Sequence, residues 1–419
     1  MPLKGNTMLS TYFENTYTLN RLGSGPLGHY LDGFAQQLDE QGYAKSVARR
    51  MLNAGARLGS FVKLKDIDLD LSNPTIIDDF RQHLATSDGI PPNKRTIEDI
   101  GHGAKQFLAY LYDTNCFNPP LKPQLAVEPE LIKTFRFWLI QHRGLSPSTV
   151  YKYCRDANKL LVTLGEDTAQ FNAKTLRHFL LDYAKQQGNG AIKTMISALR
   201  IFLRYLASQD KCLAGLENAI PRIASWHNAS LPNYLQQSEV QRILDTCDIN
   251  MVMGMRDKAV ILLLARLGLR AGDVANLNLT DIDWHDGSII VSGKNRREAR
   301  LPLPQEVGDA ILDYLKHRRP VADDAVFIRA IAPYRPFHSS SAVSTIVTRA
   351  MHKAAIVSSR YGAHILRNTA ATQMLKQGAS LYQISTVLRH QSVDMTARYT
   401  KVDIGLLNLV VQPWPEVLL

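Results

Sequence analysis

Two cations in the last third of the chain lie where they can bind a phosphate. A strongly apolar stretch, residues 259–269, is expected to form a helix that delivers Arg270 at its end. A cation placed against an apolar core needs a partner or a ligand, so Arg270 is a candidate for an ion pair with Asp273 or for phosphate binding. Lys294 lies in a basic turn between two expected strands. It is either an exposed turn residue or, when desolvated, a proton donor beside a phosphate.

Two histidines, a second arginine and a tyrosine follow further along the chain. His364 and Arg367 are three residues apart, so on a helix they share a face and can address the same phosphate. Such a pair also occurs commonly by chance. His390 follows a short amphipathic helix expected over residues 381–388, and Tyr399 comes nine residues after it. A tyrosine can act as a nucleophile when a base takes its proton, but a single tyrosine is more often a packing residue.

The order of these residues is more informative than any one of them. Two arginines, two histidines, a turn lysine and a late tyrosine occur in an order that resembles the tyrosine recombinase (phage integrase) family. The resemblance covers residues 230–419 closely, and 125–225 more loosely as a helical core-binding domain. Two positions depart from the family pattern: Asn368 stands where His is frequent, and Arg389 where Gly is frequent. Arg389 either adds a phosphate contact or marks a less common branch.

The resemblance implies a covalent mechanism on DNA. Tyr399 would attack a phosphodiester and become attached to the 3′ phosphate, and a 5′ hydroxyl would leave. Arg270 and Arg367 would clamp the non-bridging oxygens in bidentate geometry. Lys294 is the candidate general acid for the leaving hydroxyl. The expected catalytic set is listed here in chain order: Arg270, Lys294, His364, Arg367, His390 and Tyr399.

The remaining expected roles are supporting ones. His364 would help to accept the tyrosine proton, His390 would hydrogen-bond the scissile phosphate, and Asp273 would hold Arg270 in place. The phosphotyrosine conserves the energy of the phosphoester, so we expect no ATP. The fixed charges of the two arginines can take the place of a metal, so we expect no metal and no other cofactor. The expected partners are double-stranded DNA and three further copies in a homotetramer, with other recombinases possible. The apolar segment 406–414 is expected to dock either on a neighbouring copy or on its own domain.

Most of the chain has helical periodicity, so the predicted fold class is mainly α with a small antiparallel sheet. The two expected strands are 288–291 and 299–303, joined by a turn at 293–297. The helical half contains a diverged repeat whose copies begin near residues 34 and 135. Proline-rich stretches divide the chain into three expected domains. They are an extra N-terminal helical (SAM-like) domain at 1–122, which is a candidate for DNA binding, a core-binding domain at 123–229 and an α+β catalytic domain at 230–419.

The composition agrees with a polyanionic partner. The net charge is +11 over 419 residues, which favours nucleic acid without proving it. The four cysteines are scattered, with no zinc-ligand spacing, and fit a reducing cytoplasm. No membrane segment is expected, and we predict a cytoplasmic protein. Two other functions stay open at this point: DNA relaxation by a type IB topoisomerase, and DNA binding by an accessory protein without catalysis.

Overall fold

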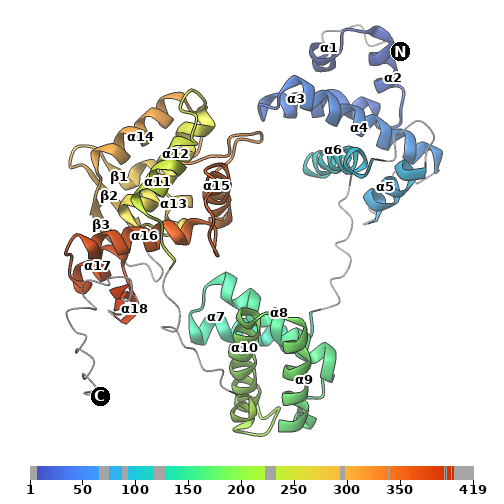
Figure 1. The fold of residues 1–419 in the computed structure, drawn as a ribbon. Coiled ribbons are helices and arrows are strands. Elements are labelled where there is room, and N and C mark those ends of the chain that lie inside the picture. The colour runs from blue at the N-terminus through green and yellow to red at the C-terminus, as the bar shows by residue number, and fades with distance from the viewer. Residues whose placement is uncertain are drawn as a thin grey trace, which may run out of the picture. The chain divides into compact units, whose positions relative to one another are not determined.

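The computed structural model describes most of the chain, in several stretches (Figure 1). These are residues 7–65, 75–86, 93–117, 128–221, 233–292, 298–337, 339–390, 392, 394–397 and 399–400. The backbone divides into two compact units, one made of 1–65, 93–108 and 227–419 and the other of 66–92 and 109–226. The predicted domain boundaries near 122 and 229 lie outside the described residues and stay predictions.

The N-terminal part of the chain is helical. It forms α1 (Met8–Tyr12), α2 (Thr16–Gly23), η1 (Gly28–Tyr30), α3 (Leu31–Glu40), α4 (Lys45–Leu64), α5 (Ile76–Thr86) and α6 (Lys94–Asp113). Helices α4 and α6 pack closely, because Gly103 brings the α6 backbone against Ala54 and Met51 of α4. Phe107 of α6 lies 5.1 Å, ring to ring, from Phe34 of α3. These contacts form an apolar core between α3, α4 and α6.

The next helices form a second bundle. It contains α7 (Glu130–Arg143), α8 (Pro147–Leu164), η2 (Thr168–Gln170), α9 (Ala173–Gln186), α10 (Asn189–Ser208) and η3 (Leu216–Ala219). Its core includes Phe135, Leu160 and Phe202. The pair α7–α8 corresponds to α3–α4, and the turns between the helices contain Gly144 and Gly42, whose φ angles are 55° and 74°. This correspondence is consistent with the repeat expected from the sequence.

The C-terminal part surrounds one long apolar helix. Its elements are α11 (Gln237–Asp245), α12 (Val252–Leu267), α13 (Ala271–Ala275), η4 (Leu279–Asp281), β1 (Ile282–Asp283), β2 (Ser288–Ser292), β3 (Glu298–Pro302), α14 (Gln305–His317), α15 (Ser340–Lys353), α16 (Ala363–Lys376), α17 (Leu381–Leu388) and α18 (Asp394–Ala397). Helix α12 is buried along most of its length and contacts α14, α15 and α16. It therefore anchors the elements that carry the candidate site.

The sheet confirms the two predicted strands and adds a short third one. Its order is β1-β2-β3, and both pairings are antiparallel. Ile289 lies opposite Leu301, and both are buried. The sequence did not reveal β1 because a strand of two residues has too few positions to show alternation. The predicted fold class, mainly α with a small antiparallel sheet, is confirmed.

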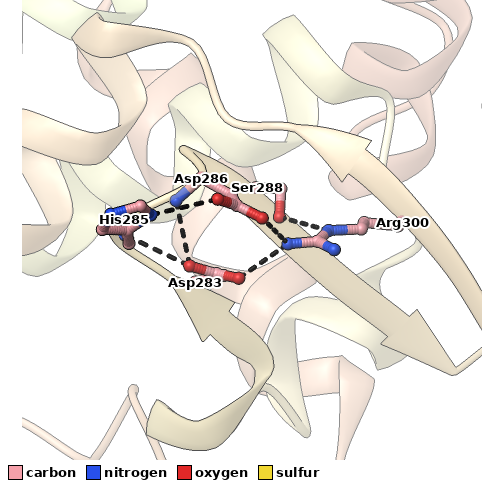
Figure 2. A network of polar contacts seen from close by, with 5 residues as sticks. All are labelled: Asp283, His285, Asp286, Ser288 and Arg300. Atoms are coloured by element: carbon pink, nitrogen blue, oxygen red, sulfur yellow. Dashed lines mark hydrogen bonds and ion pairs between the residues drawn. The ribbon is translucent and has the colours of Figure 1, made fainter.

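A network of polar side chains ties the turn after β1 to strand β3 (Figure 2). Arg300 of β3 donates to Asp283, Asp286 and Ser288. The main-chain N–H groups of His285 and Asp286 donate to Asp283. The hydrogen bond from Asp286, with help from the Arg300 charge, lowers the pKa of Asp283 below its ordinary value. The network joins β3 to the end of β1 and the start of β2, and β2 and β3 flank the segment that contains Lys294.

No helix in the described part of the chain is both long and apolar enough to cross a membrane.

Candidate active site

One cleft gathers several of the predicted site residues. It has a volume of about 830 Å³ and lies between the start of α13, α15, the start of α16 and the α17–α18 region. Four predicted residues contribute to its wall: Arg270, His364, Arg367 and His390. They come from segments up to 120 residues apart, so the tertiary fold brings together what the sequence only placed in order.

The position of Arg270 follows from the way α12 ends. Gly268 terminates the helix with a φ of 61°, a conformation that suits glycine, and a Cβ there would lie 2.5 Å from Leu388. Leu269 is then buried, and Arg270 becomes the N-cap residue of α13. Its guanidinium is half-buried, and Nη2 donates to the main-chain oxygen of Arg389 at 2.8 Å. Burial lowers the pKa of Arg270, the charge of Arg389 lowers it further, and Asp273 opposes both.

Arg367 lies deeper in the same site. Its side chain on α16 is 5% exposed and donates to the carbonyl oxygens of Gly268 and Leu388. These oxygens belong to the ends of α12 and α17, where carbonyl groups lack partners within the helix and carry partial negative charge. Burial, together with the nearby charge of Arg270, lowers the pKa of Arg367 to about 10. Arg367 is therefore still a cation at neutral pH, held by two helix ends.

The two histidines line the cleft from different elements. His364 is exposed near the start of α16, one turn before Arg367, as the spacing predicted. His390 comes directly after the α17 region, and its main-chain N–H donates to Ser385 at 2.9 Å. The Nδ1 atom of His390 lies 2.7 Å from the hydroxyl of Thr396, which is fully buried. That contact fixes the imidazole orientation, and nothing in the sequence singled out Thr396.

Tyr399 is not at the surface of the cleft. Its side chain is fully buried, and it packs in a cluster that includes Leu375 and Leu388. The ring stacks on His390 with 6.3 Å between centroids, and the hydroxyl donates to Oδ1 of Asn368 at 3.1 Å. Since no part of Tyr399 is exposed, the hydroxyl cannot meet a DNA phosphate unless the residue moves.

Asn368 is the main functional candidate to which the sequence assigned no role. Its Oδ1 accepts from Tyr399, and its Nδ2 donates to the main-chain oxygen of Asn233 at 3.1 Å. The amide orientation is therefore fixed from both sides. The available signal was its position beside Arg367, where the sequence departs from the family pattern.

Asp273 and Arg389 form a buried ion pair. The Asp273 carboxylate also accepts the main-chain N–H of Arg270 at 3.2 Å. Asp273 thus holds Arg270 through its backbone, while the partner of its carboxylate is the Arg389 guanidinium. The sequence had suggested that Asp273 holds Arg270, but it did not reveal that Arg389 takes the carboxylate.

Two predictions fall outside the described residues. Lys294 lies in the segment between β2 and β3, and residues 406–414 lie beyond residue 400. Their roles stay predictions. Among the described residues, no group of three or more His, Cys, Asp or Glu side chains is placed to hold a metal ion.

Two family patterns match the chain. The one described as "Phage integrase family" matches residues 233–404. The one described as "Phage integrase, N-terminal SAM-like domain" matches residues 132–210. Together they contain every predicted catalytic residue and most of the second helical bundle.

Related proteins match over most of the chain. The y4rA protein of Sinorhizobium fredii, provisionally named an integrase/recombinase, is 33% identical over 96% of this chain and 98% of its own length. The tyrosine recombinase XerC of Oceanobacillus iheyensis is 28% identical over 65% of this chain and 91% of its own. The first match covers the extra N-terminal region as well as the candidate site.

Solved structures share the fold. The XerH site-specific recombinase in a post-cleavage complex with a palindromic difH substrate matches with a TM-score of 0.55 and 17% identity, over 70% of this chain and 97% of its own. A lambda integrase (75–356) dimer bound to a COC′ core site matches with a TM-score of 0.51 and 19% identity, over 69% and 98%.

Proposed function

This chain belongs to the phage integrase family and is a tyrosine-type site-specific DNA recombinase, and from that premise we propose which residues break and rejoin the DNA. The proposed catalytic set is Arg270, Lys294, His364, Arg367, His390 and Tyr399. The observation that carries the proposal is the cleft that gathers four of these side chains around one space of about 830 Å³. Arg270 and Arg367 bring positive charge to that space, which suits the anionic phosphodiester.

The arginines would stabilise the transition state. As phosphorus becomes five-coordinate, negative charge grows on its non-bridging oxygens, and preorganised cations lower the barrier. Arg367 is held by two helix-end carbonyls, and the Arg270 guanidinium makes one hydrogen bond, through Nη2, within the described structure. Their remaining N–H groups can donate to the phosphate. Removing one such donor typically slows a reaction by about 10²–10³-fold.

The covalent step would exchange one phosphoester for another. The Tyr399 oxygen forms a bond to phosphorus while its proton passes towards His364, and the bond from phosphorus to the 5′ oxygen breaks. Lys294 would give a proton to that leaving oxygen, and His390 would hydrogen-bond the phosphate. A 5′ hydroxyl then attacks the phosphotyrosine in the reverse sense, so rejoining conserves the ester energy.

Tyr399 must first leave its buried position. Its ring is fully buried and its hydroxyl is bound to Asn368. We infer that the described conformation is a resting state, and that DNA binding shifts the chain towards one in which Tyr399 enters the cleft.

The proposed partner is double-stranded DNA, bound by a homotetramer. The solved relatives named above are described as bound to a palindromic difH substrate and to a COC′ core site, and a lambda integrase tetramer bound to a Holliday junction matches with a TM-score of 0.51. The net charge of +11 supports binding to a polyanion. We also propose action in the cytoplasm, which the four free cysteines and a DNA substrate support; fractionation of cells tests it.

The test begins with unbiased trapping. The protein is incubated with sheared DNA of its host, covalent adducts are isolated under denaturing conditions, and the attached DNA is sequenced. A nicked duplex built on the mapped site should then trap the wild type at Tyr399. Absence of any adduct, or an undiminished adduct with Tyr399→Phe, would refute the proposal. Joining of two different duplexes separates recombination from the relaxation of one duplex.

A further inference from the structure

Arg389 occupies a position where an arginine is unexpected. It ends α17 with φ 53° and ψ 50°, the left-handed region that residues with side chains rarely adopt. Glycine would occupy this conformation without strain. An arginine at this position carries a backbone cost that its side-chain contacts can offset.

The contacts of Arg389 join three segments around the cleft. Its Nη2 pairs with the carboxylate of Asp273 on α13, and its Nη1 donates to the carbonyl of Val291 on β2 at 3.3 Å. Its own carbonyl accepts from Nη2 of Arg270 at 2.8 Å. The Arg389 and Asp273 side chains are only 10% and 8% exposed. One residue thus uses both its side chain and its backbone to hold the neighbours of Arg270.

The charge of Asp273 explains why the contacts of Arg389 affect Arg270. A buried carboxylate needs a cationic partner, because an unpaired buried charge is costly. Asp273 lies three residues from Arg270, whose main-chain N–H it already accepts. Without Arg389, the Arg270 guanidinium, whose charge already interacts with that of Asp273, would be available to neutralise the carboxylate. An ion pair between those two would occupy the donors that the phosphate needs.

We propose that Arg389 is a positioning residue of the recombination site, which neutralises Asp273 and holds Arg270 through its own carbonyl so that the Arg270 guanidinium stays available to the phosphate. The inference rests on the proposed function of Arg270. Arg389 itself is outside the set of described residues that line the cleft, whereas its neighbour His390 is in that set. Its side chain is only 10% exposed and is bound to Asp273 and Val291, so we assign its action to Arg270 and not to direct DNA contact.

The test uses the glycine that fits the backbone. Arg389→Gly is compared with wild type on the nicked duplex carrying the mapped site, with single-turnover cleavage at saturating DNA and DNA affinity measured separately. We expect cleavage to slow by about 10- to 100-fold, with affinity within about threefold. This loss is smaller than the roughly 10²–10³-fold cost of removing a transition-state donor outright, because Arg270 is still present but is drawn towards Asp273. Arg389→Gln, which keeps most of the side chain without its charge, should lose cleavage similarly, and so gives the answer even if the glycine variant folds poorly.

Second-site rescue distinguishes positioning from simple structural damage. In an Asp273→Asn background there is no carboxylate to neutralise, so Arg389→Gly should cost less than about threefold there. The matched backbone control is Ala355→Gly, which relieves a positive φ of 51° elsewhere and should leave cleavage unchanged.

Each outcome decides the proposal. The proposal is overturned if Arg389→Gly cleaves at the wild-type rate, or if it slows cleavage by the same factor in both Asp273 backgrounds. It is also overturned by a loss confined to DNA affinity, which would assign Arg389 to direct phosphate contact. A wild type that forms no adduct is a different result, because it refutes the proposed function itself.

Discussion

Replacing Asn368 should release the nucleophile. The Tyr399 hydroxyl donates to Asn368 at 3.1 Å inside a fully buried pocket. Asn368→Leu keeps the approximate shape of the side chain but removes the acceptor. A neutral hydrogen bond contributes about 0.5–1.5 kcal/mol net. Because 1.4 kcal/mol is a factor of ten, the equilibrium between buried and released Tyr399 should shift towards release by about 2- to 12-fold.

Nitration by tetranitromethane without DNA, followed by peptide mapping, measures this shift at Tyr399 directly. Tyr12 is an internal control, since it is 1% exposed and bonded to Asp39, and its nitration should not change. Asn368→Asp retains an acceptor oxygen and should not increase nitration of Tyr399. If folded Asn368→Leu protein shows the wild-type nitration rate at Tyr399, the hydrogen bond does not restrain the nucleophile and the reasoning fails.

The remaining predictions concern the nucleophile, the deeper arginine and the thiols. Tyr399→Phe should bind the mapped DNA with wild-type affinity but form no covalent adduct in a denaturing gel; weakened binding would contradict a purely chemical role. Arg367→Lys cannot donate to both helix ends in the same geometry, so single-turnover cleavage at saturating DNA should fall about 10²–10³-fold, and a loss below tenfold would argue against the clamp. Burial raises the pKa of Cys154 and Cys247 to about 11, which keeps both thiols protonated at pH 8. With a disulfide reagent at that pH, exposed Cys116 should react first, and equally fast reaction of Cys154 would refute the described burial.

The burial of Tyr399 connects the site to the start of the catalytic region. Asn368 donates to Asn233, and the neighbouring Thr369 hydroxyl accepts the main-chain N–H of Leu235. Residues 233–235 therefore contact the helix that holds both Arg367 and the partner of Tyr399. The segment is thus joined to Tyr399 through the two hydrogen bonds of Asn368.

The local features of the site were predictable because they depend on short-range periodicity. The spacing of His364 and Arg367 placed both side chains on one helical face, and they line one cleft. The alternation around Ile289 and Leu301 predicted two strands, which pair in the structure. Such patterns are readable because backbone geometry repeats every few residues.

The sequence by itself determined the order and types of the reacting groups, and with them the family and the class of chemistry. Only the tertiary structure decided which side chains of the site bind one another. Arg389 pairs with Asp273 across 116 positions of the chain, and Tyr399 is bound by Asn368 across 31. No periodicity encodes such contacts, because they arise when separate helix ends meet in a low-dielectric interior where every buried polar group needs a partner. Apolar packing buries Tyr399 away from the cleft and Asn368 binds its hydroxyl, although its place in the sequence suggested a residue ready to react.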